Sequence, residues 1–177
     1  MRFLNKIIYI SLICLCVTSC KINFGAVSAE YSTSGASISP ETKTYSIDYF
    51  PNKALLVVTY LSSKFSDELK KYIKQKTGLN EITNNNGQVR FEGQITGYEN
   101  KPMDIKQNEV AASNRLTITI RVKYTNTLDD KFDFDQSFSN YADYSTDADF
   151  NSIEEALIEE IIQKIIEDIY TKAFVNW

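Results

Sequence analysis

Hydrophobic and polar residues alternate in several stretches of the chain, and the first of these predicts a strand. From Lys43 to Phe50 every second residue is apolar, which is the period of a half-buried strand. Its apolar face consists of Tyr45, Ile47 and Tyr49. Pro51 then interrupts the alternation and ends the predicted strand.

A helix is predicted next, because apolar residues recur at intervals of three and four up to Lys76. These residues are Leu61, Phe65, Leu69, Tyr72 and Ile73. Thr59 and Ser62 are candidate N-terminal caps, and Gly78 is the expected stop. The segment before the helix, residues 54–58, contains an apolar run from Leu55 that fits a strand or a helix equally well.

Two strands joined by a tight turn are expected after the helix. Leu79 to Thr83 is a short strand candidate, and the Asn84 to Gly87 turn that follows predicts a hairpin, since Asn-Gly tolerates positive φ. The next strand, Gln88 to Tyr98, alternates again. Gly93 and Gly97 fall on its apolar face, where they leave room for a packed neighbour or a bulge.

The clearest alternation runs from Leu116 to Tyr124, with Thr, Arg and Lys in the intervening positions. After a turn, Phe132, Phe134 and Phe138 continue the pattern. These two strands are predicted to form an antiparallel hairpin with one apolar and one charged face. The preceding stretch, residues 99–113, has no clear period and is predicted to be a long loop.

The last element is a helix that begins at Ser152 with the pattern of a capping box. Apolar pairs then recur every four residues, from 157/158 to 173/174, so each pair is rotated by about 40° from the last. Two interpretations of this winding stripe remain open. Either a twisted sheet follows it, or its end, near Tyr170, Phe174 and Trp177, contacts a partner.

These patterns together predict the fold class. Four or five mostly antiparallel strands each have one apolar face, and two amphipathic helices supply the apolar layer that covers it. The expected fold is therefore α+β, a two-layer sandwich with both helices on one face of the sheet. The opposite face is expected to be open and polar.

The N-terminus has the organisation of a secretory signal. Arg2 and Lys6 precede an apolar run from Ile7 to Val17, and Val17-Thr18-Ser19-Cys20 is similar to a bacterial lipobox, whose cysteine is acylated and becomes the first residue. A plain signal peptide containing a chance cysteine is the alternative. The predicted organisation is a signal peptide at 1–19, a lipidated N-terminus and tether at 20–39, and a single domain at 40–177.

Composition narrows the chemistry. The 177 residues are 43% hydrophobic and include 19 basic and 23 acidic side chains, a formal net charge of −4 that argues against nucleic acid as a partner. Loss of the signal removes two basic residues and leaves −6. The chain has no histidine, and of its three cysteines only Cys20 survives cleavage. We therefore expect no cofactor and no thiol or histidine chemistry.

Two groups of acidic residues are candidate sites. Asp147, Asp149 and Asn151 have the spacing that opens a calcium loop, but Ser152 and Ile158 stand where its glycine and glutamate belong, so acids at a helix N-terminus explain them better. Asp133 and Asp135 form a carboxylate pair on one predicted strand face, which a hydrolase would need in an enclosed pocket. We predict no catalytic residue and no metal site.

Several segments in order resemble the LptE-type lipoproteins of Gram-negative outer membranes, in their Bacteroidota form. Besides the lipobox, they are Tyr31-Ser32, Ser34 to Ala36, Lys43 to Asn52, Phe91 to Tyr98, Asn114 to Asn126 and the terminal Asn176-Trp177. The resemblance implies a sheet with two helices and a non-enzymatic role. That role is to partner the LptD β-barrel that inserts lipopolysaccharide into the outer membrane.

The resemblance also suggests a contact surface for lipopolysaccharide or the barrel. Its nearest equivalents here are Arg90, Arg115, Arg121 and Lys123. The alternative is that these cations form cross-strand ion pairs with Asp133, Asp135 and Glu92. The expected location is the outer membrane, with the domain facing the periplasm or inside the barrel lumen. The alternative function is a periplasmic or surface lipoprotein that binds a soluble ligand such as a glycan.

Overall fold

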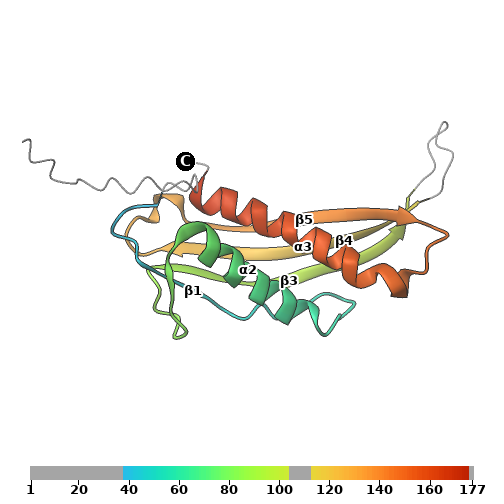
Figure 1. Ribbon diagram of the computed structural model, residues 1–177, viewed down its shortest axis with the longest axis horizontal. Helices are drawn as coiled ribbons and strands as arrows, with labels where there is room; N and C mark the ends of the chain where they lie inside the picture. The colour runs from blue at the N-terminus through green and yellow to red at the C-terminus, as the bar shows by residue number, and fades with distance from the viewer. Residues whose placement is uncertain (1–37, 104–112, 176–177) are drawn as a thin grey trace, which may run out of the picture. The chain divides into compact units, whose positions relative to one another are not determined.

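The computed structural model describes residues 38–103 and 113–175. The predicted signal peptide, Cys20, most of the tether and Trp177 lie outside the described residues. Within the described part, the chain forms one five-stranded sheet with two α-helices on one of its faces (Figure 1). This arrangement confirms the predicted α+β fold class.

The sheet is mixed, with strand order β2-β1-β3-β4-β5. The strands are β1 Thr44–Ile47, β2 Asn80–Glu81, β3 Val89–Pro102, β4 Ser113–Asn126 and β5 Phe134–Ser145. The three long strands β3, β4 and β5 are antiparallel to one another, whereas β1 is parallel to both β2 and β3. A short 3-10 helix, η2 Asp130–Phe132, lies in the turn between β4 and β5.

The predicted Asn-Gly hairpin is wrong. β1 lies between β2 and β3, so the segment around Asn85 carries the chain past the end of β1 instead of folding β3 back onto β2. Asn85 does adopt a positive φ of 54°. Gly87 packs directly against the Ser46 backbone, where a Cβ would collide. The positive φ in this turn is therefore as predicted, but the pairing is not: β3 pairs with β1, and β2 lies on the far side of β1.

A bulge in β3 changes which side chains reach the core. The pairing with β4 shifts between Ile95 and Gly97, so Thr96 has no partner in the register. Beyond this point Tyr98 is buried and Gly97 lies opposite Thr119 on the open face, which corrects its predicted placement. Gly93 stays on the core face, as predicted, because the Phe50 ring occupies the space of its missing side chain.

The two strands flanking the expected 99–113 loop are longer than predicted. β3 continues to Pro102, and its last residues pair with the first residues of β4. The rest of the predicted loop, residues 104–112, lies outside the described residues. In the first strand the alternation ends early, at Ile47: Tyr49 is 61% exposed, and Phe50 is buried instead.

The first helix, α2, spans Leu61–Thr77. Its N-cap is Tyr60, which makes no side-chain capping bond, so neither Thr59 nor Ser62 is the cap. The predicted stop is confirmed, since Gly78 closes the helix with a φ of 67°. Residues 55–58 belong to neither a helix nor a strand.

The second helix, α3, spans Phe150–Phe174 and begins earlier than the predicted capping box. Asp149 is the N-cap, and its carboxylate accepts a hydrogen bond from the Asn151 N–H at 3.3 Å. Ser152 lies inside the first turn and donates its hydroxyl to the Asp149 carbonyl at 2.7 Å. The capping box was therefore wrong, and Asp149 has the role that was assigned to Ser152.

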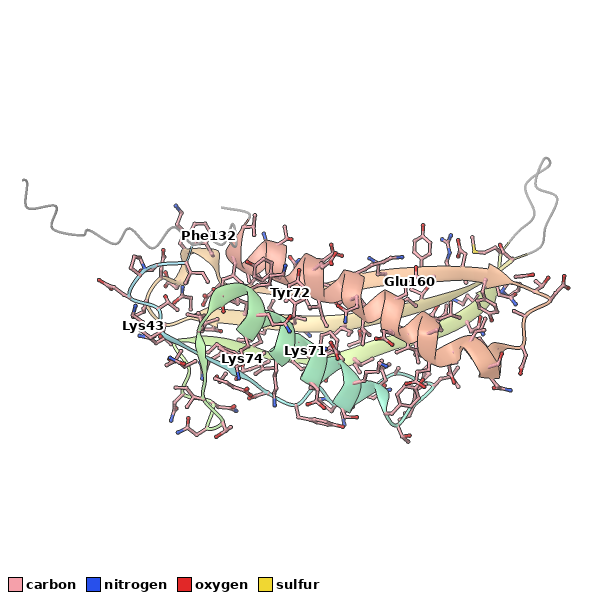
Figure 2. All side chains as sticks on the ribbon, viewed as in Figure 1. Lys43, Lys71, Tyr72, Lys74, Phe132 and Glu160 are labelled. Atoms are coloured by element: carbon pink, nitrogen blue, oxygen red, sulfur yellow. The ribbon has the colours of Figure 1, made fainter. Side chains whose placement is uncertain are left out.

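The winding stripe of α3 is buried along its whole length. Tyr170 is 6% exposed and Phe174 is 1% exposed, which favours the interpretation that the sheet covers the stripe, and Trp177 lies outside the described residues. The Phe174 ring meets those of Phe91 and Tyr124, and Tyr170 packs against Tyr72 of α2. Figure 2 shows Tyr72 between the two helices, with Lys71 and Lys74 on the surface of α2. The twist of the sheet accounts for this burial, because it follows the stripe.

Candidate functional site

The open face of the sheet carries the predicted cations, and most of them are paired with carboxylates on the neighbouring strand. The guanidinium of Arg121 on β4 donates two hydrogen bonds to Asp135 of β5, at 2.8 and 2.9 Å. The Lys123 ammonium lies 3.4 Å from Glu92 of β3. Arg121 and Lys123 thus form cross-strand ion pairs, which is the alternative that the sequence predicts for them.

Arg115, near the start of β4, has a partner that was not predicted. Its guanidinium donates to both oxygens of Asp143, at 2.6 and 2.7 Å, and lies 3.5 Å from the centre of the Tyr141 ring. These hydrogen bonds hold the pKa of the Asp143 carboxyl below its usual range. The β4 to β5 register pairs residue 115 with residue 143, so only the position of the turn could have revealed this partner.

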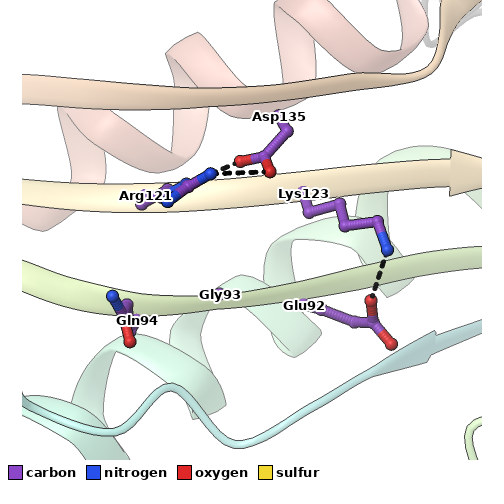
Figure 3. Close-up of a pocket in the computed structure, with 6 residues that line it drawn as sticks. All are labelled: Glu92, Gly93, Gln94, Arg121, Lys123 and Asp135. Atoms are coloured by element: carbon purple, nitrogen blue, oxygen red, sulfur yellow. Dashed lines mark hydrogen bonds and ion pairs between the residues drawn. The ribbon is translucent and has the colours of Figure 1, made fainter.

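A shallow depression of about 290 Å³ lies on this face, and its lining contains no aromatic side chain. It is lined by Glu92, Gly93, Gln94, Arg121, Lys123 and Asp135 (Figure 3). A glycan-binding lipoprotein was expected to have a deep pocket between sheet and helices with aromatic residues at its rim. This depression is on the opposite face, so it does not favour that alternative.

The four predicted cations do not form one patch. Arg115 and Arg121 are six residues apart on β4, which corresponds to about 20 Å along a strand. Arg90 lies at the other end of the sheet, where its guanidinium donates to the Asn85 carbonyl at 3.5 Å. Its Nε is buried with no hydrogen-bond partner among the described residues. Burial raises the pKa of the nearby Asp48 carboxyl, and the Arg90 charge partly offsets that rise.

The acidic pair at 133 and 135 lacks the geometry of a hydrolytic site. Asp133 lies in the turn, where its carboxylate accepts a hydrogen bond from the Asn126 N–H at 2.7 Å. Asp135 is engaged by Arg121, whose hydrogen bonds lower its pKa, whereas a general acid needs a raised one. In the part of the chain that the structure describes, no group of three or more metal-ligating side chains could hold an ion.

None of the described helices combines the length and the apolar character needed to cross a membrane. This includes α3, which has 25 residues.

The fold is shared with solved structures of bacterial proteins. A minor lipoprotein from Acinetobacter baumannii is 15% identical, with a TM-score of 0.50, and the match covers 75% of this chain and 90% of that one. A hypothetical protein from Chlamydia trachomatis is 11% identical, with a TM-score of 0.50 and coverage of 76% and 99%. A rare lipoprotein B from Shewanella oneidensis is 10% identical, with a TM-score of 0.48 and coverage of 73% and 95%. No curated protein matches the chain.

The two matches with a TM-score of 0.50 show that this chain shares its α+β fold with those proteins. Residues 42–173 match the LptE family, which is described as lipopolysaccharide-assembly. Because this match covers most of the chain, the chain belongs to the LptE family, and the resemblance found in the sequence is confirmed. It is a lipopolysaccharide-assembly lipoprotein of a non-enzymatic family.

Proposed function

We propose that this protein is the outer-membrane lipoprotein that partners an LptD-type β-barrel in assembling lipopolysaccharide into the outer membrane. The single observation that carries the proposal is the family match over residues 42–173. The fold is consistent with it, since a closed core under one sheet face leaves the other face free for contacts.

The polar open face supports this role physically. The interior of a bacterial outer-membrane barrel is polar, so a domain lodged there needs a hydrophilic exterior. Arg121, Lys123 and Arg115 offer that exterior, with their carboxylate partners alongside. We propose that these cations and Arg90 are the contacts to the barrel or to lipopolysaccharide, and that a partner exchanges or extends the ion pairs.

The membrane attachment is a second part of the proposal. Acylation of Cys20 would hold the domain at the outer membrane, facing the periplasm or within the barrel lumen, because several buried acyl chains give a stable anchor. Replacing Cys20 by Ala tests it: the variant should no longer incorporate labelled fatty acid. Incorporation at an unchanged level would show that the lipobox was misread.

The barrel contact is tested by crosslinking in cells. A photoreactive residue at Thr119 on the open face should yield an adduct with a large β-barrel protein, and depletion of the chain should mislocalise lipopolysaccharide. The matched control is the same residue at Asp168, which is exposed on α3 on the other side of the domain. Purification of the tagged chain without any barrel, together with no adduct from Thr119, would contradict the partnership.

A further inference from the structure

A small apolar projection precedes α2, and neither the core nor the open face uses it. Leu55 is fully exposed, Leu56 is 59% exposed and Val57 is 61% exposed. We call these three residues the apolar finger. Single exposed aliphatic side chains are common on protein surfaces, but three in succession at the tip of one loop form a contiguous apolar patch.

The base of the finger is held in place by one side chain. The Asn52 amide accepts a hydrogen bond from the Ala54 N–H at 3.0 Å and donates one to the Val58 carbonyl at 3.3 Å. The Lys53 N–H donates to the Ile95 carbonyl of β3 at 2.8 Å, which fixes the base to the sheet. Ala54 is 6% exposed, so the chain dips into the core just before the finger. The three apolar side chains are therefore presented outward by an anchored loop.

The residues flanking the finger have the composition of a membrane interface. Tyr49 is 61% exposed and Tyr60 is 36% exposed. Lys53 is exposed and has no ion pair in the described part of the chain. Aliphatic residues at the tip, followed by tyrosines and a lysine, match the order in which side chains occur across a bilayer interface.

Three glutamates of α3 near the start of α2 each have a partner among the described residues. Glu155 and Glu159 of α3 lie 3.4 and 3.3 Å from the Lys64 ammonium. Glu154 accepts a hydrogen bond from the Tyr98 hydroxyl. Lys53, at the base of the finger, is exposed and forms no ion pair with any described residue, and a lysine in that place suits a surface rich in phosphate.

The chain between the proposed anchor and the domain is long enough to let the finger face the membrane. Residues 20–37 number 18, and a chain of that length spans at most about 60 Å. Eight residues separate Thr44 at the start of β1 from Asn52 at the base of the finger, or about 26 Å if extended. Figure 1 shows the loop before α2 projecting at the margin of the domain.

We propose that the apolar finger inserts into the headgroup region of a lipid bilayer and forms a second membrane contact beside the lipid on Cys20. The inference rests on the proposed membrane attachment, which keeps the domain near a bilayer. Insertion is shallow, because the backbone groups of an irregular loop need water or headgroup partners. The finger then fixes how the domain is oriented on the surface, which a single lipid anchor does not do.

The test uses vesicles and a single fluorescent reporter. The mature chain, residues 20–177, contains one cysteine, Cys20, through which it is coupled to a maleimide phospholipid in phosphatidylethanolamine and phosphatidylglycerol vesicles that carry brominated acyl chains. The only tryptophan is replaced by Trp177→Phe, and Leu55→Trp supplies the reporter. Its emission should shift to shorter wavelength, with quenching roughly threefold stronger than that of a control reporter at Leu128, which is 44% exposed in another loop.

Adding Leu56→Ser and Val57→Ser should abolish most of the difference and leave the melting temperature unchanged, since both side chains are exposed. Equal quenching at positions 55 and 128 would overturn the inference. Loss of barrel co-purification in the serine variant, with no quenching at position 55, would overturn it in favour of a protein contact. Because coupling at Cys20 is chemical, failure of native acylation or of barrel capture leaves this measurement intact and counts only against the proposed function.

Discussion

The two faces of β3, β4 and β5 come from the same strands but differ in what holds their side chains. On the core face Ile118, Ile120 and Val122 have no exposed surface, and helix α3 covers them. On the open face the side chains of Arg121 and Lys123 keep about half of their exposure while forming ion pairs. Apolar burial stabilises a domain strongly, and exposed ion pairs do so weakly. Stability therefore resides mainly on the core face, and the ion pairs of the open face contribute little to it.

The largest expected effect comes from the buried end of α3. Phe174→Ala should lower the free energy of unfolding by about 4 kcal/mol, because it removes a ring packed against Phe91 and Tyr124. Urea unfolding measures this loss. The matched control is the neighbouring Val175→Ala, 40% exposed in the wild type, which should change it by less than about 0.5 kcal/mol. Equal small effects would mean that Phe174 is a surface contact after all.

A smaller loss of stability is expected from a substitution at Gly93. Gly93→Val should lower the free energy of unfolding by about 3 kcal/mol, since any side chain there would overlap the Phe50 ring and the Arg121 carbonyl oxygen. Gly78→Ala is the control, because a Cβ at that position has open space and only the positive φ to oppose it, at about 1 kcal/mol. If the two variants unfolded at the same urea concentration, the close approach at Gly93 would be disproved.

The contribution of the ion pairs on the open face to stability should depend mainly on pH. Arg115 lowers the pKa of Asp143, so the ionised carboxylate stabilises the folded state above its ordinary pKa of about 4, and this contribution is lost as the pH falls through the lowered pKa. Arg115→Ala should lower the melting temperature slightly at pH 7 and not at all at pH 2. Arg115→Lys keeps the charge but cannot donate the same pair of hydrogen bonds, so its melting temperature at pH 7 should lie between those of the wild type and Arg115→Ala. A pH-independent loss would point to packing on Tyr141 instead.

The smallest effect is expected at Asp48, and its sign is opposite. Burial raises the pKa of this carboxyl, so the folded protein holds the proton more tightly than the unfolded chain, and the ionised form destabilises the fold above the raised pKa. Asp48→Asn should therefore raise the melting temperature slightly at pH 7 and leave it unchanged at pH 3. A drop at pH 7 would show that the Arg90 charge outweighs burial.

Elements with a strong local period were predictable from the sequence. The hairpin of β4 and β5, the length of α3 and the stop at Gly78 all follow from patterns within a few residues. The fold class followed from combining their apolar faces. The family was identified from the ordered segments, and no single motif within them would have been enough.

Other features depend on residues that are far apart in the sequence. The parallel position of β1 between β2 and β3 leaves no local signal, because the same alternation fits an edge or a central strand. The bulge at Thr96 reverses the side-chain faces beyond it, so Tyr98 is buried in spite of its polar neighbours.

The candidate site was predictable in its residue types but not in its pairs. Arg121, Lys123, Asp135 and Glu92 were identified together, since they follow the alternation of adjacent strands. Asp143 could be identified as the partner of Arg115 only with the exact register of β4 and β5. Asp133 does not lie on the open face of β5 as predicted, because it belongs to the turn that follows η2. For the segment that contains the apolar finger, the sequence fits a strand or a helix equally well, and the structure shows neither. Apolar composition alone does not distinguish a buried run from an exposed one.

The place of β1 in the sheet also has a consequence for how the chain folds. β3, β4 and β5 are joined in sequence and can pair as soon as they are made, whereas Tyr45 must find Val89 across 44 residues that include the whole of α2. Closing so long a loop is slow and entropically costly until other contacts are present. We expect the three-stranded meander and α3 to form the folding nucleus and β1 to join late. The strand nearest the N-terminus would thus be the last part of the sheet to be ordered.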